Sequence, residues 1–448
     1  MSGQRKSTLA CLFAAALACL LTGLCAAGGG VWWTATRPTS PPTPTLAHIP
    51  TPTLIPTLTP APHPTLTPDS KTTERHLRIF TRLWGIVSDE YLYPDHNGAD
   101  WDGIGEEYRA RVTAGLDDEE FWLAMDEMLL ELNDDHSIFL SPAGVAEEEQ
   151  MRTGELDYVG IGVYTVALTE KEYAVVLLVL PESPASRAGL QPHDRILSVD
   201  GLPACCDADG YDRLDLLLGP DGSQVELQVQ TPGAPPRAVT VTRARIQGAL
   251  PIETRRLEGG IGYILIPDFW DETVVERARQ ALERLTAEGK LTGLILDNRI
   301  NPGGSDTVLQ EMLAFFTDGE VGHFVGRRGS EPLRVEGVDI GGSQSVPLVI
   351  LVGNETASFA EVFSGVLREA GRAHVVGRTT SGNIEIVYGY DFEDGSRAWI
   401  AQETFRPPSG TDWEETGIVP DVEIPLDWDE FTAEEDLQLE AALDLLRP

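Results

Sequence analysis

Apolar side chains recur at helical spacing over residues 72–132. Ile79, Leu83 and Val87 fall on one face of a first helix, and a second helix is predicted over 121–132. The second pattern ends at the polar segment Asn133–Ser137, which contains His136. We therefore predict a helical N-terminal part at residues 71–150.

Residues 151–246 change to short strand patterns with frequent glycine and proline. An apolar run covers 175–180, while 225–229 and 238–241 alternate with the two-residue period of half-buried strands. A short helix with a glycine C-cap is predicted over 183–190. This part of the chain should form a β-rich domain.

Residues 247–448 alternate strand and helix patterns, which predicts an α/β core with helices covering a sheet. The last two strands, 384–392 and 397–405, should form a hairpin with Asp394-Gly395 at its turn. The other predicted strands are 261–266, 291–297 and 346–352, and the predicted helices are 273–288, 308–316 and 358–370.

The first 70 residues differ in kind from the rest. Arg5 and Lys6 precede an apolar run over 9–27, so residues 1–33 are either a secretory signal peptide or a membrane anchor. Residues 34–70 are dominated by proline and threonine, which predicts an extended stalk. A stalk suits a retained anchor better than a cleaved signal. We therefore expect an extracytoplasmic protein anchored to the cell membrane through this N-terminal segment only, with secretion as the alternative.

The formal net charge of −38 argues against nucleic acid and anionic membrane surfaces as partners. The five cysteines indicate no disulfide framework and no zinc pattern, because three lie in the N-terminal apolar segment and Cys205 and Cys206 are adjacent. The sequence contains no zinc-protease or nucleotide-loop motif. We expect no metal and no cofactor, and the sequence leaves the oligomeric state open.

Residues 349–361 form the most informative segment. The apolar run 349–352 predicts a buried strand, and helical spacing begins at Phe359 after a tight turn. The Ser358 hydroxyl should then lie at a helix N-terminus, where unpaired N–H groups suit a nucleophile that attacks a carbonyl. The alternative is structural, because Ser358 and Glu361 also have the spacing of a capping box.

Four segments, in order along the chain, resemble the C-terminal processing peptidases, also called tail-specific serine proteases. Each segment alone is weak, but the four together, over residues 75–430, are strong evidence. The resemblance implies an α/β fold with a ββα-type catalytic core at 247–448, a helical N-terminal segment, and an inserted β-rich, PDZ-like, peptide-binding domain at 151–246. The segments are Leu132–Pro142; the PDZ-like pattern of Val159–Val163, Ser183–Leu190 and Gly201; Asp297–Gly304; and Thr356–Glu361, with Gly417–Asp421 closing the core.

In that family the serine at the position of Ser358 is the nucleophile, and the usual base is a lysine 25 residues later. Here that position holds Asn383, whose amide cannot deprotonate a serine, and no lysine follows Lys290. His136 is the candidate base, because an imidazole titrates near neutrality. Activity should then rise with pH around the pKa of the imidazole, about 6.5 if unperturbed. It resembles the histidine of the related tricorn protease core. The alternative is a structural imidazole.

The resemblance also implies a carboxylate partner and donors for the oxyanion. By similarity to the tricorn site, we expect the carboxylate to be Glu414 or Glu415, against the alternative of a solvated acidic loop. The implied oxyanion donors are the backbone N–H of Gly303 or Gly304 and that of Phe359. A simple tight turn is the alternative for the two glycines.

The PDZ-like segment implies binding of a peptide by strand addition, with the free carboxylate held by backbone N–H groups of Val159, Gly160, Ile161 and Gly162. The alternative is an interdomain regulatory element. We expect an extracytoplasmic serine endopeptidase that cleaves polypeptides, with C-terminal tails as the candidate recognition element. Because the lysine is lost, the alternative function is a non-catalytic PDZ-type peptide-binding pseudopeptidase.

Overall fold

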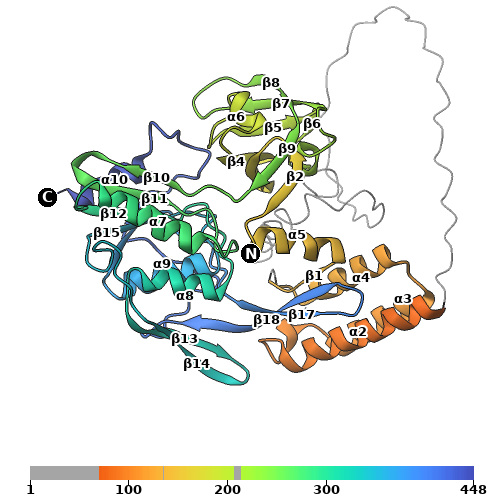
Figure 1. The fold of residues 1–448 in the computed structure, drawn as a ribbon. Helices are drawn as coiled ribbons and strands as arrows, with labels where there is room; N and C mark the ends of the chain where they lie inside the picture. The colour runs from red at the N-terminus through yellow and green to blue at the C-terminus, as the bar shows by residue number, and fades with distance from the viewer. Residues whose placement is uncertain (1–69, 135, 206–212, 448) are drawn as a thin grey trace, which may run out of the picture.

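The computed structural model describes residues 70–134, 136–205 and 213–447 (Figure 1). The predicted anchor, and the predicted stalk up to residue 69, lie outside these residues. Within the described ranges, no helix is long and apolar enough to cross a membrane.

The N-terminal part consists of three helices whose apolar faces pack together and against a β-hairpin. Phe80, Leu83 and Phe121 are fully buried in this cluster, which also includes Phe392 and Ile400 of the hairpin. The third helix starts with a capping box between Asp117 and Glu120, as its sequence favours. The helices are α2 (Ser70–Glu90), α3 (Trp101–Ala114) and α4 (Asp118–Leu130).

A six-stranded sheet forms the centre of the molecule. Its strand order is β10-β11-β12-β15-β16-β19, and all neighbouring pairs are parallel except β10 with β11. Helices α7, α8 and α9 cover one face of this sheet. The other face is covered by α10 and by two strands of the PDZ-like domain. The strands are β10 (Glu253–Arg256), β11 (Ile261–Leu265), β12 (Gly293–Asp297), β15 (Leu348–Val352), β16 (Ala373–Gly377) and β19 (Val422–Glu423); the helices are α7 (Val274–Ala287), α8 (Asp306–Ala314), α9 (Phe359–Glu369) and α10 (Leu437–Leu446).

A second sheet connects the N-terminal helices to the core. Its order is β1-β18-β13-β14, with β17 also paired to β18. Strand β1 follows the segment that contains His136, and Ile138 pairs with Trp399. This pairing fixes the His136 segment against β18. The strands are β1 (Ile138–Leu140), β13 (Gly319–Gly326), β14 (Gly329–Val335), β17 (Ile386–Asp391) and β18 (Arg397–Arg406).

The PDZ-like domain is a sheet of order β3-β4-β5-β7-β8, in which β3 is an edge strand. Helix α5 leads into the domain, and strands β2 and β9 pair with each other where the chain enters and leaves it. The elements are α5 (Pro142–Arg152), β2 (Leu156–Gly160), β3 (Val163–Leu168), β4 (Tyr173–Val179), α6 (Pro184–Arg187), β5 (Arg195–Val199), β6 (Leu202–Pro203), β7 (Gln224–Gln230), β8 (Arg237–Thr242) and β9 (Ala244–Gly248).

The predicted fold class, an α/β core with a helical N-terminal segment and an inserted β-rich domain, is confirmed. Cys205 is disulfide-bonded, a bond that the cysteine pattern did not predict. His323 and His374 lie on strands β13 and β16, and their side chains are 41% and 68% exposed, respectively.

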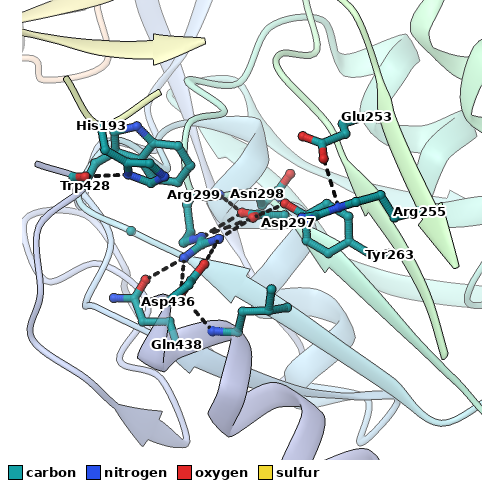
Figure 2. A network of polar contacts seen from close by, with 12 residues as sticks. His193, Glu253, Arg255, Tyr263, Asp297, Asn298, Arg299, Trp428, Asp436 and Gln438 are labelled. Carbon is teal, nitrogen blue, oxygen red and sulfur yellow. Dashed lines mark hydrogen bonds and ion pairs between the residues drawn. The ribbon is translucent and has the colours of Figure 1, made fainter. Parts of the chain in front are cut away.

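A buried ionic network lies where the core meets the PDZ-like domain (Figure 2). The Arg299 guanidinium, 3% exposed, donates to Asp297 (Nη2–Oδ2 2.6 Å) and pairs with Asp436 (Nη2–Oδ2 2.8 Å). Its guanidinium carbon lies 5.0 Å from the ring centroid of Trp428. On the PDZ-like side, His193 stacks on Trp428 and donates through Nδ1 to the Trp428 carbonyl at 2.7 Å. Arg299 therefore joins the loop after β12 to the C-terminal segment and, through it, to the PDZ-like domain.

We predict that Arg299→Ala lowers the free energy of unfolding by about 3–5 kcal/mol, because it leaves two buried carboxylates without their cation. Urea denaturation followed by tryptophan fluorescence measures this loss. Arg279→Ala is the matched control, since Arg279 pairs with Glu276 on the exposed face of α7 and its removal should change little. A loss below ~1 kcal/mol for Arg299→Ala would contradict a dry, coupled network.

Candidate active site

Ser358 lies between β15 and the first residue of α9. Its backbone has φ 52° and ψ −128°, a conformation that residues with a side chain rarely adopt. Two hydrogen bonds from its N–H hold this turn, to the Asn383 carbonyl at 2.6 Å and to Glu361 Oε2 at 3.1 Å. A serine in a strained strand-to-helix turn is a recurring arrangement for an exposed nucleophile.

Glu361 fixes the Ser358 turn to the loop that contains Asn383. Its carboxylate is fully buried and accepts hydrogen bonds from the N–H groups of Ser358 and Asn383, the latter at 2.9 Å. It also accepts from Gly382 N–H at 2.7 Å and Thr380 Oγ1 at 2.5 Å. Burial raises the pKa of Glu361 to about 8, against the effect of these donors. The Ser358–Glu361 spacing thus has the structural role of a capping contact, and this does not compete with a chemical role for the Ser358 hydroxyl.

No lysine takes the place that Asn383 leaves. Among the described residues, Lys71 and Lys290 are exposed. Lys171 pairs with Asp427 at 2.9 Å and with Asp429 at 2.7 Å, at the boundary of the PDZ-like domain. Asn383 itself is buried and acts through its backbone, by accepting from Ser358 and donating to Glu361.

His136 lies between two carboxylates. Its side chain is 6% exposed, and its Nε2 atom is 3.7 Å from Glu385 Oε2 and 3.7 Å from Glu414 Oε1. Asp134 shapes the segment, because its Oδ1 atom accepts from the His136 N–H at 3.0 Å and from the Ser137 N–H at 2.7 Å. The imidazole is therefore held in an acidic, water-poor environment.

These carboxylates control the charge of the imidazole. Burial lowers the pKa of His136, but the nearby carboxylate of Glu414 and the charges of Glu385 and Asp134 outweigh burial and raise it to about 9. Burial, opposed by the charge of His136, raises the pKa of Glu385 to about 7. At neutral pH the resting cluster therefore favours an imidazolium.

Three consecutive residues connect the serine turn to this cluster. The Asn383 carbonyl accepts from Ser358, the Ile384 N–H donates to Glu414 Oε2 at 2.9 Å, and Glu385 faces His136. The segment thus brings the predicted Ser358, His136 and Glu414 into one region. Of the two acidic candidates, Glu414 faces the imidazole, while Glu415 donates through its N–H to the Gly382 carbonyl at 2.8 Å.

Gly303 and Gly304 lie in the loop that the sequence predicts to supply an oxyanion donor. Gly303 has φ 90°, and a side-chain Cβ there would lie 2.7 Å from Ser358 Cβ and 2.9 Å from Phe359 N. Gly304 has φ 150°, and its Cβ would lie 2.1 Å from the backbone carbon of Phe269. The Gly303 N–H donates to Asn301 Oδ1 at 2.9 Å. The loop is therefore pressed against the serine turn, with the Gly303 N–H already engaged.

The predicted carboxylate-binding loop leads into the edge strand β3. Val159 and Gly160 belong to β2, and Ile161 is buried, with its carbonyl accepting from Ala185 N–H at 2.8 Å. Gly162 has φ 80°, and a Cβ there would lie 2.4 Å from Ser183 Cβ, so only glycine fits. Strand β3 offers the unpaired edge that strand addition needs, whereas Val159 and Gly160 pair with β9, so only Ile161 and Gly162 of the predicted loop lie outside a strand.

His136, Glu385 and Glu414 also have the composition of a metal site. Among the residues that the structure describes, they are the one group of this kind, with donor atoms within 4.8 Å of one another. An imidazole between two carboxylates can also take up and release a proton. A serine peptidase needs a group that does this.

Comparison with known protein families identifies each part of the chain. The profile of Peptidase family S41 matches residues 260–424, that of the PDZ domain matches 175–231, and that of the Tricorn protease C1 domain matches 73–130. The carboxyl-terminal-processing protease of Synechocystis is 31% identical over 383 residues, which cover 82% of this chain and 86% of the relative. The chain belongs to peptidase family S41. It is a serine peptidase with a PDZ domain.

Other relatives and solved structures agree with this assignment. The chloroplastic carboxyl-terminal-processing peptidase 2 of Arabidopsis thaliana is 30% identical over 373 residues, covering 79% of this chain and 69% of that protein. The photosystem II D1 C-terminal processing protease superposes with a TM-score of 0.59 at 27% identity, covering 78% of this peptidase and 93% of that chain. A putative S41 protease from Bacteroides fragilis shares the fold, with a TM-score of 0.52 at 17% identity over 82% of this chain and 96% of that one.

Sequence reasoning missed two polar residues beside His136. Glu385 lies within the apolar segment Ile384–Ile386, and a charged residue at such a position was a usable signal of a buried carboxylate. Tyr93 donates its hydroxyl to Glu385 Oε1. No motif marks Tyr93, because it reaches the site only through the packing of the N-terminal helices against β18.

Proposed function

We propose that this S41 peptidase cleaves polypeptides with Ser358 as nucleophile, His136 as general base and Glu414 as the carboxylate partner. The observation that carries this proposal is the position of His136 between two carboxylates. Glu385 belongs to the segment that binds the Ser358 turn, and Glu414 accepts a hydrogen bond from that segment. Asn383 at the family's lysine position supports it, since a different base is then required.

The proposed reaction follows acyl transfer. His136 takes the Ser358 hydroxyl proton as the oxygen bonds to the substrate carbonyl carbon, and then gives that proton to the leaving amine when the C–N bond breaks. A water molecule, deprotonated by His136, attacks the acyl-enzyme ester and releases the second product and the free serine. Glu414 stabilises the imidazolium that forms in each step.

Two backbone N–H groups are proposed to hold the oxyanion, those of Gly304 and Phe359. The close approach of the Gly303–Gly304 loop to the serine turn supports this choice. Between the two glycines we favour Gly304, because the Gly303 N–H donates to Asn301 Oδ1.

We propose that substrates are polypeptides presented by their C-terminal tails. The relatives are named carboxyl-terminal-processing proteases, and the PDZ domain has an edge strand, β3, that follows the segment Val159–Gly162. The tail would add as a strand along β3, with its carboxylate at the loop. The alternative is a peptide-binding pseudopeptidase, in which no residue replaces the lost lysine as base.

The location of the protein is also a proposal. The apolar run behind Arg5 and Lys6, followed by the proline- and threonine-rich segment, supports an extracytoplasmic peptidase tethered to the cell membrane.

We predict that Ser358→Ala lowers the rate of casein cleavage at least ~10³-fold, because it removes the nucleophile. The wild-type protein should react covalently with a fluorophosphonate probe, and the variant should not. Equal cleavage by both proteins would rule out Ser358. A wild-type protein that neither cleaves casein nor reacts with the probe would favour the pseudopeptidase.

We predict that kcat/KM rises with pH, with the midpoint of the rise near pH 9. The reason is that His136 must be neutral to accept a proton and the carboxylates raise its pKa to about 9. His136→Ala should lower turnover steeply across this range. Lys290→Ala, at an exposed lysine, is the control and should leave the profile unchanged. A lysine base can also give an alkaline limb, so the His136 variant decides: wild-type turnover in it would refute the mechanism.

We predict that the full-length chain fractionates with membranes and is released by protease cleavage within residues 34–70. Immunoblotting of membrane and soluble fractions measures this. A wholly soluble species that begins near residue 28 would instead indicate a cleaved signal peptide.

A further inference from the structure

We propose that Glu385, held in place by Tyr93, is a positioning residue that stabilises the protonated form of His136 and so sets the pH range of the peptidase. This inference rests on the proposed function, in which His136 is the base. It assigns different tasks to the two carboxylates that face the imidazole.

The geometry of Glu385 leaves one oxygen directed at the imidazole. Its side chain is 4% exposed, and its Oε2 atom is 3.7 Å from His136 Nε2. Oε2 is buried and accepts no hydrogen bond from the described residues. A buried carboxylate oxygen without a donor is costly unless a cation faces it. The imidazolium of His136 is the group in position to supply that charge.

Tyr93 fixes the other oxygen. Its hydroxyl donates to Glu385 Oε1, and its pKa is raised by burial and by the charge of Glu385, so it remains a donor throughout the working pH range. The chain at Tyr93 is anchored to the second sheet, because the Leu92 N–H donates to the Ala401 carbonyl at 2.8 Å. A single donor on Oε1 restrains the carboxylate and leaves Oε2 directed at His136.

Glu414 is bound differently. Its Oε2 atom accepts the Ile384 N–H at 2.9 Å, which ties it to the backbone segment that also holds the serine turn. It is therefore placed to orient the imidazole relative to Ser358. Glu385 is bound through Tyr93 to the N-terminal helical part. It therefore contributes its negative charge to His136 and does not align the imidazole with Ser358.

The direction of the effect follows from the charges around His136. Asp134, Glu385 and Glu414 all raise its pKa, while burial lowers it. Between pH 7 and 9 the favoured state pairs an ionised Glu385 with an imidazolium. Neutralising Glu385 removes one of these three anions, so the imidazole should become neutral at lower pH.

The test compares pH profiles of kcat/KM for the full-length chain, with fluorescently labelled casein as the probe. Glu385→Gln preserves the shape and an acceptor for Tyr93, and its ascending limb should move to lower pH by about one unit. Its plateau should stay within about tenfold of wild type, whereas Glu414→Gln should lose at least ~10²-fold. Tyr93→Phe should shift the limb in the same direction by less.

The chain supplies a matched control pair. Tyr388 donates its hydroxyl to Glu403 Oε2 at 2.7 Å on the exposed face of β17 and β18. Tyr388→Phe and Glu403→Gln remove the same chemistry from the same sheet and should leave the limb in place. A shift in these variants as large as that of Glu385→Gln would overturn the assignment, because it would show a general effect of surface charge.

A second measurement does not depend on turnover. In the Ser358→Ala background, the His136 imidazole can be titrated by NMR, with His136→Gln to assign its signal, and Glu385→Gln should lower its pKa. An unchanged pKa and limb would overturn the proposal, as would a plateau loss equal to that of Glu414→Gln. If Ser358→Ala retains activity, the proposed function fails, and the NMR titration still tests the Glu385–His136 pair.

Discussion

The rest of the structure depends on the placement of one buried cation, Arg299. Removing a guanidinium from water is costly, and attraction to a single carboxylate rarely offsets that cost. Here Asp297 and Asp436 both pair with it, Gln438 accepts another of its hydrogen bonds at 3.1 Å, and aromatic rings lie beside it. Because the glycine loop begins four residues after Arg299, the network that satisfies this charge also fixes the loop that faces the serine turn.

The serine turn depends on a second buried ionisable group, the carboxyl of Glu361. Glu361 accepts four hydrogen bonds from two segments that are distant in sequence, and it thereby holds a residue with φ 52° in a conformation that it would not adopt alone. The site therefore uses buried ionisable groups in two ways. Arg299 and Glu361 are satisfied and make the backbone rigid, whereas His136 lies among carboxylates that leave its protonation adjustable.

The sequence predicted what local patterns determine. Apolar runs located β12 and β15, and motif order identified the segments of Ser358, His136 and Glu414 before any contact was known. It did not predict Tyr93 and Glu385, which are 292 residues apart in the chain and meet only through the packing of α2 against β18. It also did not predict the disulfide of Cys205. Long-range polar contacts have no periodicity, so a single sequence cannot reveal them.

The way the PDZ domain covers the central sheet has a consequence for modularity. Val166, Val175 and Leu177 of β3 and β4 lie in the same apolar cluster as Tyr263 and Val349 of the sheet. A core expressed without this domain would present part of that apolar face to water and would be prone to self-association. The two domains should therefore melt together, as one cooperative unit. A homologous PDZ domain could replace this one only if its outer face also matched the sheet, which restricts recombination between family members.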